Sequence, residues 1–158
     1  MQPDVSGRPM TAEEYPAAVA ASAAGYAHDL EALAGQTRAA AEQKAKADFA
    51  VILPQGLETP GHTLVIIEAG GEPVGRLWLA ERDLGGRQVL YIYEIAIDPE
   101  HQGRGYGRQA MLLAETEARK RGLTRIELNV FGRNDVARNL YRSLGYVENS
   151  VQMSKDLG

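Results

Sequence analysis

The first third of the chain is rich in alanine and carries apolar residues at helical spacing. In residues 15–33 an apolar side chain recurs every three or four positions, namely Val19, Ala23, Tyr26, Leu30 and Leu33. This period predicts a helix with one apolar face. Thr11 and Glu14 have the spacing of a capping box at its start. A second stripe over residues 41–52 predicts another helix from Thr37 to Leu53, which Pro54 ends.

The pattern then changes to strands. Residues 63–69, 74–82 and 89–98 are rich in β-branched and aromatic side chains, and glycine-containing turns separate them. Three such runs with short turns predict an antiparallel meander. Pro99 stops the third strand, because proline cannot donate a hydrogen bond to a neighbouring strand.

The second half alternates helices with strands. A glycine-rich loop at 101–107 precedes a helix that ends at Gly122, a strand is expected at 126–131, and a helix at 134–144 ends at Gly145. Short closing strands are expected at 146–147 and 151–155. A strand, a helix and a strand in succession predict a right-handed parallel crossover. The predicted fold class is therefore α+β with a mixed, mostly antiparallel sheet, without a linker or an internal repeat.

Composition narrows the function classes. The chain has 158 residues, a net charge of −4 and no cysteine. The absence of cysteine excludes disulfides, thiolate metal sites and a cysteine nucleophile, and the three histidines show no metal spacing. The acidic balance argues against nucleic-acid binding. No apolar run has the length of a membrane span and the N-terminus has no apolar signal core, so we expect a cytoplasmic protein with no membrane partner and no metal.

The segment from Asp98 to Arg108 is the most informative for ligand binding. A buried strand ends there, glycines follow at 103, 105 and 107, and a helix begins. Such a turn can aim several backbone N–H groups and the positive end of a helix dipole at one phosphate group. Arg104 and Arg108 would add charge. The dinucleotide and Walker motifs do not fit, and a glycine-rich turn without a ligand is the alternative.

Two segments together resemble the GNAT superfamily of acyl-CoA-dependent N-acyltransferases. The run 102–107 (QGRGYG) is similar to the family's Q/R-x-x-G-x-G/A signature, and the run 134–146 (NDVARNLYRSLGY) is similar to its N-x-x-A-x-x-L-Y-x-x-x-G-F/Y segment. The resemblance covers nearly the whole chain. It implies a single domain over residues 1–158, with a six- to seven-stranded sheet, a central splayed parallel pair and about four flanking helices. The first strand would then be Asp4 to Pro9.

The resemblance implies acetyl-CoA as co-substrate and assigns its contacts. The pyrophosphate would sit on the backbone amides of Gly103, Arg104, Gly105, Tyr106, Gly107 and Arg108, with Gln102 at the loop entrance. The pantetheine arm would pair with the backbone of Ile95, Ala96 and Ile97, which requires the parallel strands to splay. A bulge near Glu94–Ile95 is the expected cause of the splay. Asn134 matches the family asparagine that contacts the coenzyme.

Two residues are the catalytic candidates. Tyr141 matches the family tyrosine that faces the thioester sulfur, where it would act as general acid or hydrogen-bond donor; the alternative is ordinary core packing. Glu94 is the candidate base, directly or through water, because alternation places it on one face with apolar Ile92 and Ala96. A salt bridge is the alternative for Glu94. Some family members instead place a glutamate where this chain has Asn129, which cannot accept a proton.

The acceptor is the least defined part of the prediction. Because there is no acyl-cysteine route, direct transfer to a primary amine in a ternary complex is expected. The mild acidity suggests a cationic small-molecule or peptide amine, and a homodimer is possible. Tyrosines and a histidine in the first half are pocket candidates: Tyr15, Tyr26, His28, Tyr91 and Tyr93. Two alternatives remain: a non-catalytic acyl-CoA-binding or regulatory module on the same fold, and a nucleotide-binding protein.

Overall fold

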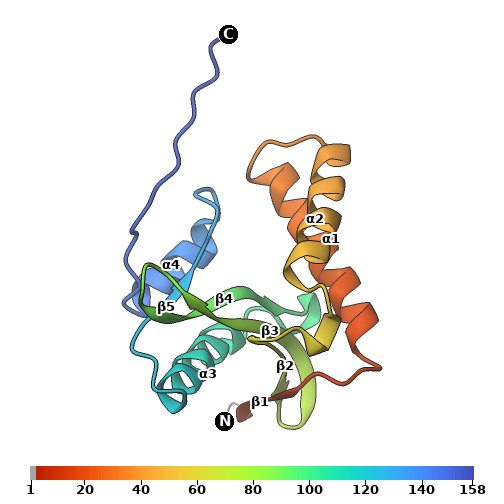
Figure 1. Cartoon of the computed structure of the whole chain (residues 1–158), viewed down its shortest axis with the longest axis vertical. Helices are drawn as coiled ribbons and strands as arrows, with labels where there is room; N and C mark the ends of the chain where they lie inside the picture. The colour runs from red at the N-terminus through yellow and green to blue at the C-terminus, as the bar shows by residue number, and fades with distance from the viewer. Residues whose placement is uncertain (1–2) are drawn as a thin grey trace.

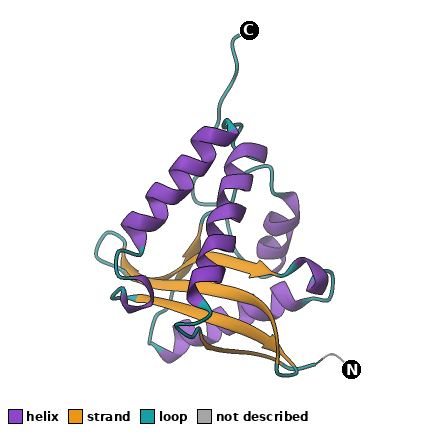
Figure 2. Cartoon of the chain, turned by 90° about the vertical axis from the view of Figure 1, so that its right-hand side faces the viewer, coloured by secondary structure: helices purple, strands orange, loops and turns teal. Residues whose placement is uncertain are grey.

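The computed structural model describes residues 3–158, in which a twisted sheet lies between helices on both faces (Figures 1 and 2). The strands are β1 (Val5–Pro9), β2 (His62–Ala69), β3 (Glu72–Asp83), β4 (Gln88–Ile97) and β5 (Ile126–Leu128). The helices are α1 (Tyr15–Ala32), α2 (Arg38–Ile52), α3 (Tyr106–Lys120) and α4 (Asp135–Ser143), with two single 3₁₀ turns, η1 (Gly56–Glu58) and η2 (Pro99–His101).

The helical pair predicted in the first third is confirmed, and Thr11 and Glu14 form the hydrogen bonds that their spacing predicts, one turn before α1. The backbone N–H of Thr11 donates to Oε1 of Glu14, and the backbone N–H of Glu14 donates to Oγ1 of Thr11. These reciprocal bonds close the turn that leads into α1. The hydroxyl oxygen of Thr37 accepts a hydrogen bond from the N–H of Ala40 and so caps α2.

The sheet follows chain order, β1 to β5, in the described residues. The first four strands pair antiparallel, while β4 and β5 are parallel and are joined through α3. This confirms the meander, the first strand and the parallel crossover. The predicted bulge is also present, one residue earlier than expected. Trp78 faces Glu94 and Leu79 faces Ile92, so Tyr93 is the extra residue in β4.

Two apolar layers enclose the sheet. One face packs against α3 and contains its most buried side chains, among them Ile67, Leu79, Leu90 and Met111. The other face packs against α1 and α2 around Trp78. The alternation of side chains along β3 produces this division, since Leu77 and Leu79 lie in the first layer and Trp78 in the second.

The C-terminal end of the sheet differs from the sequence prediction. The strand expected at 126–131 ends at Leu128, and the closing strands expected at 146–147 and 151–155 do not form. The sheet of the described residues therefore has five strands instead of six or seven, and the parallel pair lies at its edge instead of its centre. Residues 147–158 have no backbone hydrogen bond to β5, although β5 is the outermost strand and its other edge is unpaired.

Candidate functional site

The parallel strands diverge where the candidate site begins. Pairing between β4 and β5 runs from Leu90–Ile126 to Ile92–Leu128 and stops there. Ile95 and Ile97 still pair with β3 on their other side. The backbone edge of β4 beyond the Tyr93 bulge is therefore available to an extended ligand. The pairing of the two strands ends at the Tyr93 bulge, as the expected splay requires.

A glycine turn connects this edge to α3. Gly103 and Gly105 have φ of 78° and 81°, in the left-handed region that favours glycine. Gly105 is the residue that precedes α3, and the first bond within the helix runs from the N–H of Gln109 to the oxygen of Gly105. The amides of Tyr106, Gly107 and Arg108 therefore have no partner within the helix, as at any helix N-terminus. This arrangement can bind an anion.

Side chains of the loop hold its shape. Nε2 of Gln102 donates a 2.9 Å hydrogen bond to the oxygen of Ile97, which fixes the loop to the end of β4. The guanidinium of Arg108 donates to Oγ of Ser143 on α4 at 2.6 Å. The Arg108 side chain thus joins α3 to α4, while its backbone amide remains part of the turn. Arg104 contacts the oxygen of Glu100 within the loop.

Helix α4 places two further predicted residues beside this turn. Oδ1 of Asn134 accepts a hydrogen bond from the N–H of Ala137 and caps α4. Leu140 packs near Gly107, where an added Cβ would lie 3.7 Å from its Cδ2. Tyr141 follows Leu140, is half-buried, and packs against the α3-side core. Burial raises the pKa of the Tyr141 hydroxyl above its ordinary value, so it remains protonated at neutral pH.

Glu94 lies in a network of charged and polar side chains on the opposite face of the sheet from α3. Its Oε1 accepts hydrogen bonds from Oγ of Ser22 at 2.6 Å and from Nε of Arg76 at 3.0 Å. The same Nε lies 2.7 Å from Oγ of Ser22. Glu94 and Arg76 are only 21% and 17% exposed. The salt bridge weighed as an alternative for Glu94 is therefore present, and sequence reasoning missed both partners.

Because of the bulge, the neighbours of Glu94 on its face of the sheet differ from those that the sequence predicts. Simple alternation placed Glu94 with Ile92 and Ala96. Ile92 instead lies in the α3-side core, because the extra residue Tyr93 reverses the alternation at that point. Glu94 therefore shares its face with Ala96, Tyr93 and Arg76, a more polar setting than the sequence pattern suggested.

A small cavity borders this network. It has about 10 Å³ of space, which is room for one water molecule. Its wall includes the polar side chains of Ser22, Arg76 and Glu94 among apolar residues of α1, α2 and the sheet. Three polar neighbours are enough to hold a buried water.

A row of aromatic side chains continues from Glu94 along the sheet. Trp78 stacks on Tyr93 with ring centroids 4.6 Å apart, and Tyr91 meets Tyr93 edge-on at 4.8 Å. The guanidinium carbon of Arg82 lies 4.5 Å from the centroid of Tyr91. Nε1 of Trp78 donates to Nδ1 of His62 at 2.9 Å, and burial lowers the pKa of His62, so this histidine is neutral.

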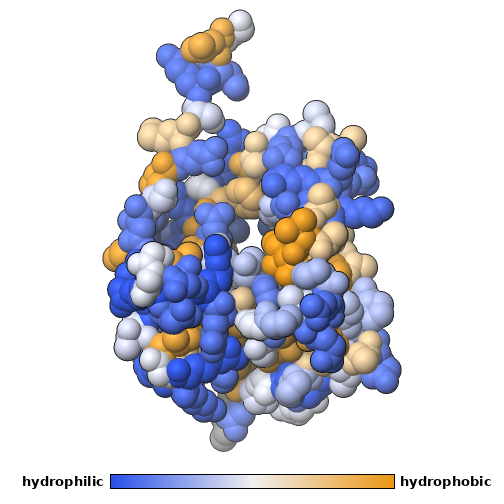
Figure 3. All heavy atoms as spheres, viewed as in Figure 1, coloured by the Kyte–Doolittle hydropathy of each residue, from blue (hydrophilic) through white to orange (hydrophobic). Residues whose placement is uncertain are grey.

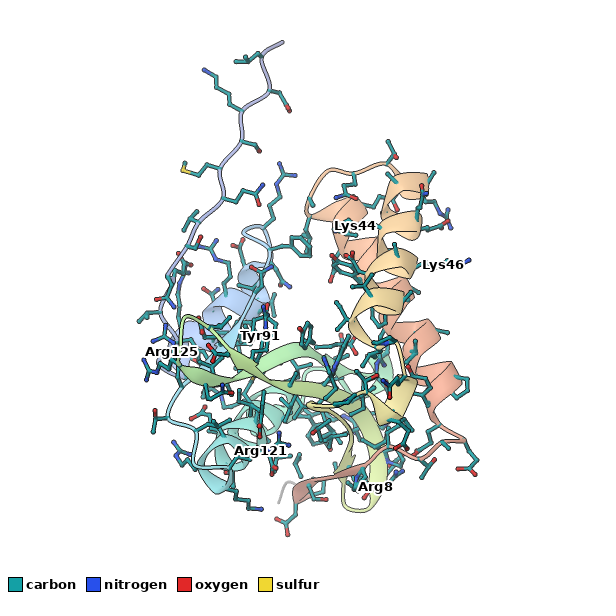
Figure 4. All side chains as sticks on the ribbon, viewed as in Figure 1. Arg8, Lys44, Lys46, Tyr91, Arg121 and Arg125 are labelled. Atoms are coloured by element: carbon teal, nitrogen blue, oxygen red, sulfur yellow. The ribbon has the colours of Figure 1, made fainter. Side chains whose placement is uncertain are left out.

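Tyr91, at the end of the aromatic row, lies at a hollow of the surface. Tyr91 is placed over β4 between α4 and the α1–α2 pair (Figure 4), and the surface is hollowed between these two parts (Figure 3). Of the predicted pocket residues, Tyr91 and Tyr93 are thus near Glu94. Tyr15 packs against the same apolar cluster as Tyr93, beside Gly56 of η1. Tyr26 donates to Asp48 on α2, and His28 is exposed on α1, so these two lie elsewhere on the α1–α2 pair.

None of the helices in residues 3–158 has the length and apolar character that crossing a membrane requires. The same residues contain no group of three or more histidine, aspartate or glutamate side chains arranged to hold a metal ion.

Comparisons with known proteins agree on one family. Residues 28–146 match the acetyltransferase (GNAT) family. The uncharacterized N-acetyltransferase YycN of Bacillus subtilis is 32% identical over 150 residues, which cover 94% of this chain and 96% of YycN. The crystal structure of YycN superposes with a TM-score of 0.92 over 98% of this chain and 99% of its own. A protein of Clostridium acetobutylicum that is described as a predicted acetyltransferase and was crystallised with acetyl-CoA shares the fold at 14% identity, with a TM-score of 0.65 over 97% of this chain and 96% of its own.

Proposed function

Because this chain belongs to the GNAT acetyltransferase family, we propose that it transfers an acetyl group from acetyl-CoA to a primary amine by direct attack within a ternary complex. The observation that carries the proposal is the junction of β4 with α3. There the unpaired edge at Ile95–Ile97 meets a left-handed glycine turn whose helix amides have no partner within α3.

The residues present fit the coenzyme. The amides from Gly103 to Arg108 would hold the pyrophosphate, and no atom lies within 4 Å of a Cβ built on Gly103, so the turn has open space. The backbone of Ile95, Ala96 and Ile97 would pair with the extended pantetheine arm as an additional strand would. Asn134, at the start of α4, would contact the coenzyme from the other side.

Tyr141 would donate a proton to the departing thiolate. In the reaction the amine nitrogen bonds to the thioester carbonyl carbon, the carbon–sulfur bond breaks, and the sulfur leaves with the electron pair. Burial raises the Tyr141 pKa, so its hydroxyl carries a proton that it can donate to the sulfur. A backbone N–H freed by the bulge in β4 would polarise the carbonyl oxygen as its negative charge increases.

Glu94 would accept the proton that the amine loses. Its carboxylate lies on the aromatic side of β4, and the adjoining cavity has room for one water through which the proton can pass. The acceptor would enter the hollow over Tyr91 and Tyr93. Ser22 and Arg76 both bind Oε1 of Glu94, so Oε2 is the oxygen assigned to proton transfer.

One observation favours a second candidate function, a non-catalytic acyl-CoA-binding module. Glu94 forms an ion pair with Arg76 and accepts a hydrogen bond from Ser22, as a carboxylate with a purely structural role would. A thiol-release assay with acetyl-CoA and a broad panel of primary amines separates the two functions. An enzyme releases free thiol with at least one amine, whereas a binding module binds acetyl-CoA and releases none.

A displacement titration tests the ligand class independently. We expect acetyl-CoA to displace a fluorescent CoA derivative at lower concentration than ATP or NAD does, because only CoA offers both a pyrophosphate and an extended arm for β4. Tighter binding of ATP or NAD would overturn the proposal in favour of a nucleotide-binding protein.

A further inference from the structure

Arg82 of β3 lies against the tyrosines at the hollow assigned to the acceptor. Its guanidinium carbon is 4.5 Å from the ring centroid of Tyr91 and 5.9 Å from that of Tyr93, and Tyr91 is placed between α4 and the α1–α2 pair (Figure 4). Contact with a ring occupies the face of a guanidinium, whereas its N–H donors lie in the plane of the group. The side chain can therefore stay on the tyrosines and donate hydrogen bonds from its edge.

Arg82 differs from the other partly buried arginines in residues 3–158. Each of the others forms an ion pair with at least one carboxylate: Arg8, Arg76, Arg121, Arg125 and Arg138. Arg82 is also partly buried, but within the described chain its charge lies on tyrosine rings and forms no ion pair with a carboxylate. A buried charge without a counter-ion is costly. An anionic partner from outside the chain would therefore bind here favourably.

The carboxylates around Arg82 already have other partners. They lie beside it in β3, opposite Tyr91 in β5 and beyond the bulge in β4: Glu81 pairs with Arg121, Asp83 binds Gly86 and Gln88, Glu127 pairs with Arg125, and Glu94 pairs with Arg76. His62 adds no positive charge, because burial and the charge of Arg82 lower its pKa. Among the described residues around these tyrosines, Arg82 is thus the uncompensated cation.

The spacing along β4 indicates the length of a ligand that would reach both Arg82 and the proposed base. Tyr91, which contacts Arg82, and Glu94 are three residues apart, roughly 10 Å along an extended strand. An amine at Glu94 and an anionic group at Arg82 must therefore be several bonds apart. One positive charge matches a carboxylate better than a phosphate, whose charge at neutral pH approaches −2.

Phe131 favours a small acceptor over a folded protein. This residue follows β5 and packs against a cluster of α1 and α2 that contains Ala27, Leu30, Ala41 and Ala45. The two walls of the hollow, which Figure 3 shows on either side of it, therefore touch at Phe131. A short flexible molecule can lie between walls that are joined in this way, whereas the surface of a folded protein is hindered.

We propose that the acceptor is a small primary amine with a carboxylate several bonds from its nitrogen, and that Arg82 binds this carboxylate and so determines acceptor specificity. The inference rests on the proposed acetyl transfer, which places the amine at Glu94. The edge of the guanidinium would donate hydrogen bonds to both carboxylate oxygens. The acceptor would then be a zwitterion rather than a simple cation.

Thiol release with two matched acceptors tests the proposal. 6-Aminohexanoate carries the carboxylate, and 6-aminohexanamide has the same length without the charge. We expect the wild type to favour the acid in kcat/KM by roughly 10- to 100-fold, mainly through KM, the range that a hydrogen bond between charged groups supports. In Arg82→Gln this ratio should fall to near one. The control Arg87→Gln removes an exposed arginine from the turn between β3 and β4 and should keep the ratio.

The ratio within each variant cancels a general loss of activity. Equal use of both acceptors by the wild type would overturn the carboxylate subsite and leave the acetyl transfer intact. A preference that survives in Arg82→Gln would overturn the role of Arg82. If circular dichroism shows that Arg82→Gln does not fold, Arg82→Lys decides, because it keeps the charge but not the planar fork. An unchanged ratio in Arg82→Lys would then overturn the role of Arg82, and a lowered ratio would support it.

Calorimetry separates failure of this inference from failure of the proposed function. If no amine releases thiol, the acetyl transfer is wrong, and titration of both acceptors in the presence of free coenzyme A tests the subsite by binding alone. Tighter binding of the acid by the wild type, lost in Arg82→Gln, would support the subsite. Equal binding of the acid and the amide would overturn it.

Discussion

Ser22 on α1 donates a 2.6 Å hydrogen bond to the carboxylate of Glu94 on β4, across the interface between the first helix and the sheet. Arg76 from β3 binds the same carboxylate oxygen. Two consecutive strands and a helix far from them in sequence thus fix the orientation of one carboxylate beside the hollow assigned to the acceptor. Movement of α1 relative to the sheet would change that orientation, so the position of this helix is coupled to the proposed base.

Glu94→Gln tests the base directly. The amide cannot take the proton of the amine, so we expect turnover to fall by about 10²-fold, at the lower end of the effects of general bases. The acidic limb of the pH–rate profile should flatten in the same variant. Steady-state rates from pH 5 to 9 provide the measurement. A profile identical to that of the wild type would assign the base to water or to another group.

Ser22→Ala tests the positioning role. Loss of the hydroxyl removes one of the two groups that orient Glu94, so we expect a several-fold loss of turnover with an unchanged Michaelis constant for acetyl-CoA. The matched variant Ser22→Thr keeps a hydroxyl at this position and should recover most of the rate. Equal losses in both variants would mean that packing of α1, rather than the hydrogen bond, is responsible.

Gly105→Asp tests the glycine turn. The variant places a carboxylate where the diphosphate would bind and forces a non-glycine residue to φ near 81°. We expect coenzyme binding to be lost in isothermal titration calorimetry. Gly122→Asp is the control, since Gly122 has φ of 73° at the other end of α3. It introduces the same charge and a similar backbone strain and should bind acetyl-CoA normally; equal losses would show that strain alone explains the effect.

Tyr141→Phe tests the proton donor. We expect turnover to fall while the affinity for acetyl-CoA changes little, because the ring remains in place and only the hydroxyl is removed. Tyr146→Phe is the control, since its ring centroid lies 6.0 Å from that of Tyr141. The Tyr146 hydroxyl is buried without a hydrogen-bond partner, so its removal should preserve turnover and raise stability by up to about 1 kcal/mol. An undamaged rate in Tyr141→Phe would contradict the acid role.

Glu14 should make stability depend on acidic pH. Hydrogen bonds from Arg8 and from the backbone of Thr11 lower the pKa of Glu14 from 4.5 to about 2. A lowered pKa in the folded state means that the carboxylate stabilises the fold above pH 4.5 and that this contribution is lost as the pH falls toward 2. The stability difference between wild type and Glu14→Gln should therefore shrink over that range in urea unfolding. The difference for the exposed neighbour Glu13→Gln should stay near zero throughout.

Gly75→Ala tests the close approach of β3 and β4. A Cβ at this buried position would overlap the carbonyl oxygen of Ala96, which is backbone and cannot turn aside. We expect a loss of about 2 kcal/mol or more in unfolding free energy and weaker coenzyme binding, because Ala96 lies in the proposed pantetheine strand. Gly25→Ala in α1 meets no atom within 4 Å and should instead gain about 0.5–1 kcal/mol. Thermal melting with calorimetry measures both.

Elements with one-sided burial were predictable from the sequence. The period of apolar residues located α1 and α2, and alternation located the strands of the meander, because each of these elements packs one face on a core. The glycine turn was predictable because glycine at 103 and 105 is where the backbone needs a positive φ. The bulge was predictable within one residue only through the family resemblance, which implies that the parallel strands part beside the pantetheine arm.

The partners of Glu94 were not predictable in the same way. Ser22 and Arg76 lie 72 and 18 positions from Glu94, and no local pattern carries such a pairing. The reversal of alternation at Tyr93 also concealed which face Glu94 occupies. The closing strands at 146–147 and 151–155 were predicted wrongly for a different reason. An alternating pattern shows that a segment can form a strand, but it does not show that a neighbouring strand pairs with it.

The aromatic row has a practical consequence for measurement. Trp78 is the chain's single tryptophan, is 5% exposed, and lines the same small cavity as Glu94. Its indole N–H donates a hydrogen bond to His62, and its ring stacks on Tyr93. Tryptophan emission therefore reports on the acceptor side of the sheet without an added label. A change in this emission on titration with amines would identify acceptor ligands without a turnover assay.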